Sequence, residues 1–305
     1  MSNYSEQIDA LFAFFKTKNL RQVTAVICGV ALFNLSFRSY YSPYELNVAR
    51  DLHDNNQKGK RKIVGFWHIG KSNYDTDISR DQFVMSQADR ILNSFLFRNR
   101  NSKELNYDLS LNYVTREPLE KQTTEFLDST GVIHELKPTA LPMKDDVEYF
   151  EFPTLAEVHK YCQDPKNIDT GVFYIHTKTH DEWREAMENF VLGESCVKCL
   201  ADEHNMACGL NHIQGWVWEH FSGNFWMTRC SHVAKLNVPF TDTLLEEALD
   251  STHPLRVVPP FGRMFAEYWM LNDGGERKPR TKEFKQGLIS SDRICSEQSE
   301  YSFHP

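Results

Sequence analysis

Two segments of the chain hold the residues whose types and spacing best suit chemistry. His176, Thr177 and Lys178 follow an apolar run, so a strand ending here would carry a cation and two hydrogen-bond donors to the edge of a sheet. Further along, the sequence HFSGNFW (220–226) sets a serine, a glycine and an asparagine between aromatic residues. Flat apolar faces beside hydroxyl and amide groups suit a sugar ring, which has apolar C–H faces and a rim of hydroxyls. The two segments together predict a carbohydrate site.

The elements that must position these segments alternate between strands and helices. Alternating or continuous apolar runs predict strands, and apolar residues at helical spacing predict helices. The predicted strands are 62–68, 105–114, 131–136 and 171–175, and the predicted helices are 79–97, 123–126, 153–161, 181–192 and 231–236. This alternation indicates an α/β protein with a mixed, mostly parallel sheet flanked by helices.

In open α/β sheets, ligands bind beyond the carboxyl ends of the strands. Two loops follow such ends, one with His68 and Gly70 and the other with residues 176–178. Helix 181–192 comes next, and its apolar positions, Trp183 among them, predict a packing stripe. Arg184, which lies off that stripe, is either a phosphate clamp or a solvated surface charge.

One carboxylate lies within an aromatic helix near the end of the chain. The sequence RMFAEYW (263–269) surrounds Glu267 with apolar residues, which requires either a paired cation or an altered pKa. Two interpretations follow, a buried ion pair with Arg263 and a catalytic base.

Composition limits the classes of partner. The chain has 305 residues, 41% of them apolar, which is enough to build a large core. The net charge of −8 argues against a long basic surface for nucleic acid, although a local basic pocket for phosphate remains compatible with it.

The seven cysteines are too few for a disulfide-built scaffold, and their odd number leaves at least one thiol unpaired within the chain. Cys196 and Cys199, followed by His204, Cys208 and His212, fit either a zinc cluster or ordinary packing on a helix. A disulfide from Cys208 or Cys230 would require an oxidising compartment.

Near the N-terminus, residues 23–37 form an apolar run with basic residues on both sides. Its 15 residues fall short of the ~20 that span a typical bilayer, but thinner membranes accept shorter spans. The run is either a short membrane anchor with the rest of the chain in the lumen, or a buried helix or strand. We expect an N-terminal segment with anchor and stem (1–60), one main domain (61–275) and a polar C-terminal tail (276–305).

The order of several motifs resembles a known family. EFPTL (151–155), FYIHTK (173–178), WREAM (183–187), HFSGNFW (220–226) and AEYWM (266–270) occur in the same order in a group of glycosyltransferase-like proteins of microbes, algae and large viruses. The resemblance covers roughly residues 62–273. It implies a GT-A-like, Rossmann-like domain that transfers a sugar from a nucleotide-sugar donor to a glycan or other hydroxyl acceptor.

The resemblance also implies roles for individual residues. Glu267 would be the general base, by analogy with a carboxylate late in GT-A domains. The donor and its diphosphate would be bound by His68, Gly70, His176, Thr177, Lys178 and Arg184. The sugar or acceptor would be bound by His220, Ser222, Gly223, Asn224 and Trp226, with Trp226 stacking on a ring.

Metal use and location are left open by the sequence. Many GT-A enzymes bind Mn²⁺ or Mg²⁺ through an Asp-x-Asp sequence, and no convincing one follows the fourth strand here. Asp75-Thr76-Asp77 matches this pattern but fits a loop after the first strand.

We expect a type II membrane protein of the Golgi or endoplasmic reticulum, with a cytoplasmic protein as the alternative. A carbohydrate-binding or scaffold protein of the same fold is the rival function.

Overall fold

The structure is a computed structural model. It describes residues 61–70, 78–102, 107–140, 150–178, 181–213, 219–236, 238–239, 265–272 and 293–298. All of them lie in the second of two units into which the chain divides, residues 60–305.

The centre of this unit is a mixed seven-stranded sheet with the order β3-β2-β1-β4-β8-β5-β9. Strands β1 to β4 run parallel to one another, and β8 is antiparallel to both of its neighbours. The strands of the sheet are β1 (Arg61–Ile69), β2 (Tyr107–Thr115), β3 (Ile133–Glu135), β4 (Gly171–His176), β5 (Ala207–Cys208), β8 (Trp226–Arg229) and β9 (Ile294–Cys295). The predicted α/β class and mostly parallel sheet are confirmed.

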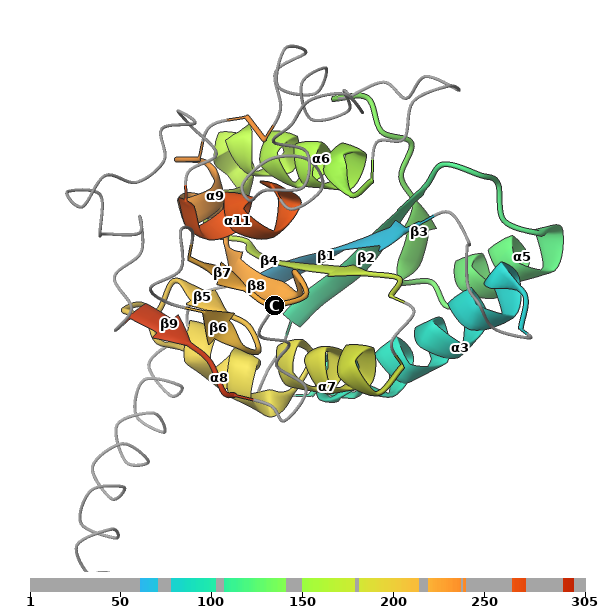
Figure 1. Ribbon diagram of the computed structural model, residues 1–305, viewed down its shortest axis with the longest axis horizontal. Helices are drawn as coiled ribbons and strands as arrows, with labels where there is room; N and C mark the ends of the chain where they lie inside the picture. Colours follow the sequence, from blue (N-terminus) through green and yellow to red (C-terminus); the bar gives the residue numbers. More distant parts are fainter. Residues whose placement is uncertain are drawn as a thin grey trace, which may run out of the picture. The chain divides into compact units, whose positions relative to one another are not determined.

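Helices cover both faces of the sheet (Figure 1). One face packs against α3 (Arg80–Asn93), α4 (Phe95–Arg98), α7 (Asp181–Val191) and α8 (Glu194–Ala201). The other face packs against α6 (Phe152–Gln163), α9 (Cys230–Val233) and α11 (Phe265–Asn272). Helix α5 (Lys121–Ser129) lies beside α3, and a short hairpin is made by β6 (His212–Ile213) and β7 (His220–Phe221). The alternation along β1 explains the two layers, because Trp67 faces the first group of helices while Phe66 faces the second.

Most predicted elements are present with small shifts at their ends. The predicted helix 79–97 is divided at Ser94, whose backbone is extended, into α3 and α4. A capping box fixes the start of α3, because Ser79 accepts a hydrogen bond from the Gln82 amide and Gln82 accepts one from the Ser79 amide. The predicted helix 231–236 is shorter and begins earlier, at Cys230.

Three disulfides join six of the seven cysteines: Cys162–Cys230, Cys196–Cys208 and Cys199–Cys295. The zinc interpretation is therefore wrong, because Cys196, Cys199 and Cys208 use their sulfur atoms in these bonds. The pairing of the cysteines could not be predicted from the sequence, because bonded partners lie up to 96 residues apart. Residues 294–295, which the sequence assigns to the C-terminal tail, form the edge strand β9 and are fastened to α8 by the third bond.

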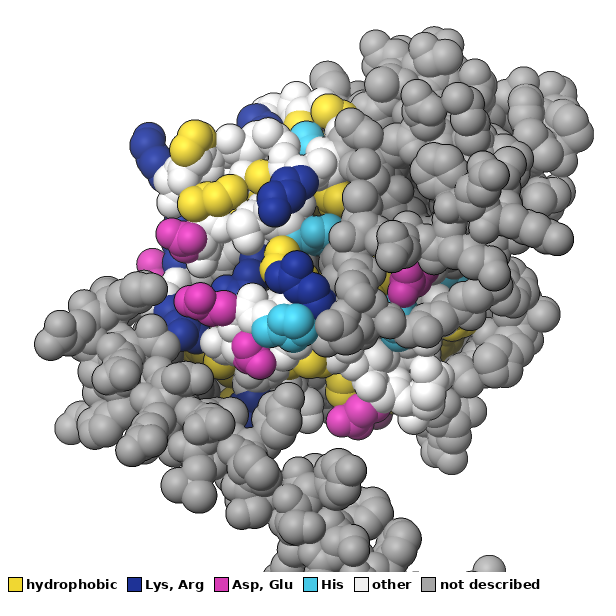
Figure 2. Space-filling view, turned by 90° about the vertical axis from the view of Figure 1, so that its left-hand side faces the viewer, with side chains coloured by type: hydrophobic (Ala, Val, Ile, Leu, Met, Phe, Trp, Pro, Cys, Tyr) yellow, Lys and Arg dark blue, Asp and Glu magenta, His cyan; other side chains and the backbone are white. Residues whose placement is uncertain are grey.

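Figure 2 shows the side of the domain on which β5 and β9 lie; in its described part, basic and acidic side chains are interspersed around histidines. The predicted anchor, residues 23–37, lies outside the described residues. Within those that are described, no helix combines the length and apolar character that a membrane span needs.

Candidate functional site

The centre of the candidate site is the point where the chain changes direction across the sheet. From β1 the chain builds β2 and β3 to one side, and it then crosses to β4 on the other side. The crossover helix α3 lies on one face and α6 on the opposite face, so β1 and β4 flank a topological switch point (Figure 1). Ligands of open α/β sheets bind in the crevice beyond the carboxyl ends of two such strands. His68 and His176 are direct neighbours there in the parallel register.

Glu151, directly before α6, is the carboxylate at this point. Its Oε2 accepts hydrogen bonds from the Tyr174 hydroxyl at 3.2 Å and from Asn224 Nδ2. Its Oε1 lies 3.7 Å from His176 Nδ1. One turn further along α6, Thr154 Oγ1 lies 3.0 Å from His68 Nδ1. The start of α6 thus holds the rings of both histidines. We call His68, Glu151, Tyr174, His176 and Asn224 the switch-point cluster.

Burial and charge set the protonation states of this cluster. Burial lowers the pKa of His68 to about 4, although the Glu151 carboxylate acts in the opposite direction. Burial also lowers the pKa of His176. Burial alone would raise the pKa of Glu151, but His176, His68, the Asn224 hydrogen bond and Lys178 together bring it below its ordinary value. The pKa of Tyr174 is raised well above normal by burial and by the Glu151 charge. At neutral pH the cluster therefore contains a neutral His68 imidazole and an ionised Glu151 carboxylate.

The predicted turn 222–224 contacts this cluster through its backbone and through Asn224. Gly223 and Asn224 both have positive φ, 90° and 57°, and the Gly223 carbonyl lies 2.9 Å from His176 Nε2. A side chain at Gly223 would collide with Met187, so the glycine allows the turn to approach α7. Asn224 Oδ1 accepts a hydrogen bond from Trp226 Nε1 at 2.9 Å. The turn is a structural support of the cluster.

Trp226 has a different place from the one that the sequence suggests. The side chain is 1% exposed, and its ring stacks on Tyr174 with centroids 5.4 Å apart. It belongs to the core between the sheet and α6. Its ring therefore packs within the protein and does not make the predicted contact with a sugar. Ser222 and His220 are also buried, Ser222 donating its amide hydrogen to the Asn211 carbonyl at 3.0 Å.

The loops after β1 and β4 are bonded to each other. The Thr177 amide donates to the His68 carbonyl at 2.9 Å, and the Gly70 amide donates to Thr177 Oγ1 at 2.8 Å. A Cβ at Gly70 would lie 3.2 Å from Thr177 Oγ1 and 3.9 Å from His68 Nε2, so a side chain there would crowd both groups. Lys178 extends from the second loop, with Nζ 3.7 Å from the centroid of the Trp183 ring.

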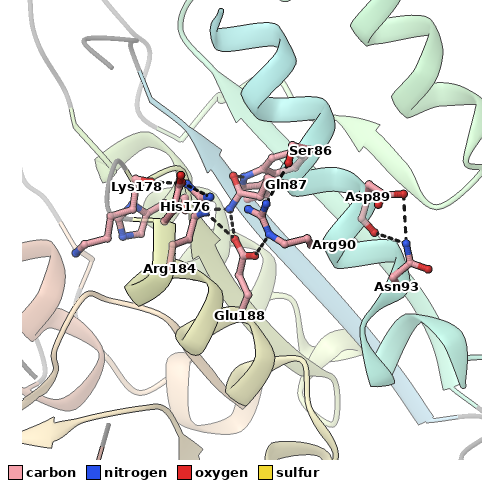
Figure 3. A network of polar contacts seen from close by, with 11 residues as sticks. Ser86, Gln87, Asp89, Arg90, Asn93, His176, Lys178, Arg184 and Glu188 are labelled. Carbon is pink, nitrogen blue, oxygen red and sulfur yellow. Dashed lines mark hydrogen bonds and ion pairs between the residues drawn. The ribbon is translucent and has the colours of Figure 1, made fainter. Parts of the chain in front are cut away.

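A second polar group lies on the opposite face of the sheet (Figure 3). Glu188 of α7 accepts a hydrogen bond from Gln87 Nε2 at 2.6 Å and one from Arg90 Nε at 3.0 Å. Arg184 Nε lies 3.5 Å from the same carboxylate. We call Gln87, Arg90, Arg184 and Glu188 the buried network. Burial raises the pKa of Glu188 despite the two guanidinium groups.

The buried network contacts the backbone of the β4 loop. Gln87 Nε2 lies 3.2 Å from the His176 carbonyl, and Arg184 Nη1 donates to the Lys178 carbonyl at 2.6 Å. Arg184 is 2% exposed and also bonds to Asp181 at 2.6 Å. The interpretation of Arg184 as a solvated surface charge is therefore wrong. Its guanidinium holds the loop through the Lys178 carbonyl.

Glu267 lies in α11, as predicted, and is partly exposed. Its charge contributes to the raised pKa of Tyr174, so this carboxylate lies within electrostatic range of the switch-point cluster. The alternative partner, Arg263, lies outside the described residues. Within the described part of the chain, no group of three or more His, Cys, Asp or Glu side chains is arranged to hold a metal ion.

The sequence did not single out Glu151 or Glu188. Glu151 stands at the start of EFPTL, where Phe152 and Pro153 open a helix after an acidic residue. Glu188 lies four residues after Arg184, a spacing that predicts an ion pair on one face of a helix. Both signals are local, whereas the partners that give these carboxylates their place come from β4, α3 and the 222–224 turn.

Comparison with known proteins adds one finding. Neither the curated proteins nor the solved structures compared with this chain gave a match. A family described as "Domain of unknown function (DUF8361)" matches residues 72–278, which is more than half of the chain and includes strands β2 to β8 but neither β1 nor β9. The chain belongs to this family.

Proposed function

We propose that this protein is a glycosyltransferase with a GT-A-like domain, which moves a sugar from a nucleotide-sugar donor to a hydroxyl group of a glycan. The observation that carries the proposal is the switch-point cluster, since it gathers ionisable and hydrogen-bonding groups where α/β sheets bind nucleotides. The motif resemblance supplies the reaction class, and the parallel order β3-β2-β1-β4 supports a Rossmann-like nucleotide-binding half.

The reaction requires groups that stabilise the leaving diphosphate and a group that accepts a proton. The acceptor oxygen forms a bond to the anomeric carbon as the bond from that carbon to the diphosphate breaks, and the bonding electrons leave with the diphosphate. Lys178 would offset this negative charge, and the imidazole of His68 would donate a hydrogen bond to it. Glu267 would accept the proton from the acceptor hydroxyl. Glu151 would hold His176, and it contacts no reacting atom in this scheme.

His68 is suited to the contact with the donor. Its Nδ1 bonds to Thr154, and its Nε2 has no hydrogen-bond partner among the described residues. The lowered pKa keeps the ring neutral, so that it binds an oxygen atom by a hydrogen bond without itself needing a counter-ion. The donor would therefore be bound by one neutral group, His68, and one charged group, Lys178.

The disulfides support a location in the secretory pathway. Three of them in one domain are typical of proteins that fold in an oxidising compartment. We propose a lumenal domain in the Golgi or endoplasmic reticulum, anchored through residues 23–37 as a type II membrane protein.

The test is a thermal-shift screen of the full chain, purified with its disulfides intact, against UDP-, GDP- and dTDP-sugars, with and without Mn²⁺ or Mg²⁺. A ligand that binds only the folded state raises the melting temperature. We expect one nucleotide to give a selective shift, and the metal arms then show whether a divalent ion contributes. The absence of a shift with every donor, in a well-folded sample, would contradict the proposal.

One variant of the chain separates catalysis from binding. Glu267→Gln should keep the donor-induced shift and abolish release of the nucleoside diphosphate in the presence of acceptor glycans. Unchanged turnover would remove Glu267 from the mechanism. Glycan binding without donor binding would favour the rival carbohydrate-binding protein.

A further inference from the structure

Trp183 lies beside the switch-point cluster, in the first turn of α7. A Cβ placed on Gly223 would lie 3.0 Å from Trp183 Cζ2, so the indole borders the 222–224 turn. Unlike Trp226, which is buried, Trp183 is partly exposed. The structure thus brings a second tryptophan, one that the sequence assigned to packing, to the edge of the site.

Lys178 lies on the face of this indole. Its ammonium is 3.7 Å from the ring centroid, a cation–π contact. The same charge lowers the pKa of both Glu151 and His176, so the ammonium lies within electrostatic range of the cluster. Its backbone is fixed by Arg184, which donates to the Lys178 carbonyl from below (Figure 3). The backbone of the loop is therefore held by Arg184.

From these contacts we infer that Lys178 and Trp183 together recognise a ligand in which an anionic group adjoins a flat ring, namely the nucleoside diphosphate part of the donor. Lys178 exchanges the indole face for the diphosphate, and the uncovered indole stacks on the nucleobase or the sugar. Arg184 is a positioning residue that keeps the Lys178 backbone in place. The inference rests on the proposed function, because it names the groups that bind the proposed donor.

Simple energetics support the exchange. A cation–π contact at a partly exposed site is weak, whereas a charge-assisted hydrogen bond from an ammonium to a phosphate is among the stronger polar contacts. A phosphate oxygen therefore competes well for Lys178. A stacked ring regains apolar contact for the indole after the ammonium leaves, so the two events favour each other.

The experiment is a titration of the full chain followed by intrinsic tryptophan fluorescence, with affinities measured in parallel by calorimetry. The probes are inorganic pyrophosphate, which carries only the anionic part, and UDP, GDP and dTDP, which add a ring. The variants are Trp183→Phe and Lys178→Met. Lys198→Met is the control for an exposed lysine paired within α8.

We expect a nucleoside diphosphate to change the fluorescence of the wild-type chain. Trp183→Phe should remove most of that signal and weaken binding by about tenfold or more. Lys178→Met should weaken pyrophosphate and nucleoside diphosphate binding alike, and Lys198→Met neither. If Trp183→Phe is poorly folded by near-UV circular dichroism, the Lys178→Met and Lys198→Met pair carries the test.

The failures are distinguishable. If the wild-type chain binds none of the probes and none of the nucleotide sugars, the proposed function and this inference fall together. If it binds a nucleoside diphosphate but Trp183→Phe and Lys178→Met bind it as tightly as the wild type, the inference is wrong while the proposed function stands.

Discussion

The switch-point cluster and the buried network lie on opposite faces of the same strand end, and both hold His176. The cluster contacts its ring through Glu151 and the Gly223 carbonyl, whereas the network contacts its backbone through Gln87. The carboxylate of the network is buried and paired, because Glu188 accepts hydrogen bonds from Gln87 and Arg90 and forms an ion pair with Arg184. The cluster leaves His68 Nε2 without a partner among the described residues and has Lys178 beside it. We therefore expect the buried network to stabilise the fold, and we propose that the switch-point cluster binds the ligand.

The largest effect is expected from breaking the buried network. Glu188→Ala leaves Arg184 and Gln87 buried without the carboxylate, and we expect a loss of about 3–5 kcal/mol in the free energy of unfolding. Urea denaturation measures it. Glu185→Ala, on the exposed side of the same helix, is the matched control and should cost under about 0.5 kcal/mol. Equal losses of unfolding free energy in the two variants would show that the network contributes no more to stability than an exposed side chain of the same helix.

The next effect concerns pH and His68. Its pKa is about 4 in the folded state against 6.5 for the free side chain, so the unfolded chain takes up this proton first. The stabilisation is fully present above pH 6.5 and is lost as the pH falls toward 4, by up to about 3 kcal/mol. His68→Asn retains a hydrogen-bonding group but does not titrate. Its free energy of unfolding should therefore decline less than that of the wild type between pH 7 and pH 4.5, and parallel declines would contradict the assignment.

A smaller change in stability, with a clear change in binding, is expected at Glu151. Glu151→Gln keeps the shape of the side chain and can still accept the Tyr174 hydrogen bond. Its free energy of unfolding should therefore be only about 1 kcal/mol lower than that of the wild type. Donor affinity should fall by about tenfold, since His176 loses the carboxylate beside its ring and the cluster loses its negative charge. Calorimetric titration together with urea denaturation separates the two quantities. A stability loss as large as that of Glu188→Ala, with affinity unchanged, would reverse the comparison.

The smallest effect is expected at the rim of the buried network. Arg90 is about one-quarter exposed, and it pairs with Glu188 at 3.0 Å. Arg90→Gln should cost about 1 kcal/mol or less, because solvent screens the outer ion pair. Donor binding should stay as in the wild type, since Arg90 does not touch the β4 loop. A marked loss of affinity in this variant would show that the whole network, rather than Arg184 and Gln87 alone, positions the loop.

The sequence predicted the parts of the molecule that depend on local patterns. The apolar run before His176 and the helical spacing after Asp181 were sufficient to place β4 and α7, and the alternation of elements indicated the α/β class. Because strand ends gather at one edge of a parallel sheet, His68 and His176 were expected near each other. Their direct pairing confirms the geometry.

What the sequence missed depends on partners that are distant in the chain. Glu151 acquires its place from Asn224, which is 73 residues away, and Cys199 from Cys295, which is 96 residues away. Neither distance leaves a local signature. The two tryptophans illustrate the same limit, since Trp226 and Trp183 both border aromatic or polar motifs, and only the packing shows which one is buried.

The most direct test of the central claim is hydrogen–deuterium exchange of the full chain, with and without the nucleotide sugars of the screen. If the crevice beyond β1 and β4 binds the donor, one nucleotide sugar should slow exchange in the peptides that contain residues 66–70 and 176–184, and leave β9 unchanged. Protection elsewhere, with these two segments unaffected, would place the binding site outside the switch point. The absence of protection with every donor would contradict the proposed function itself.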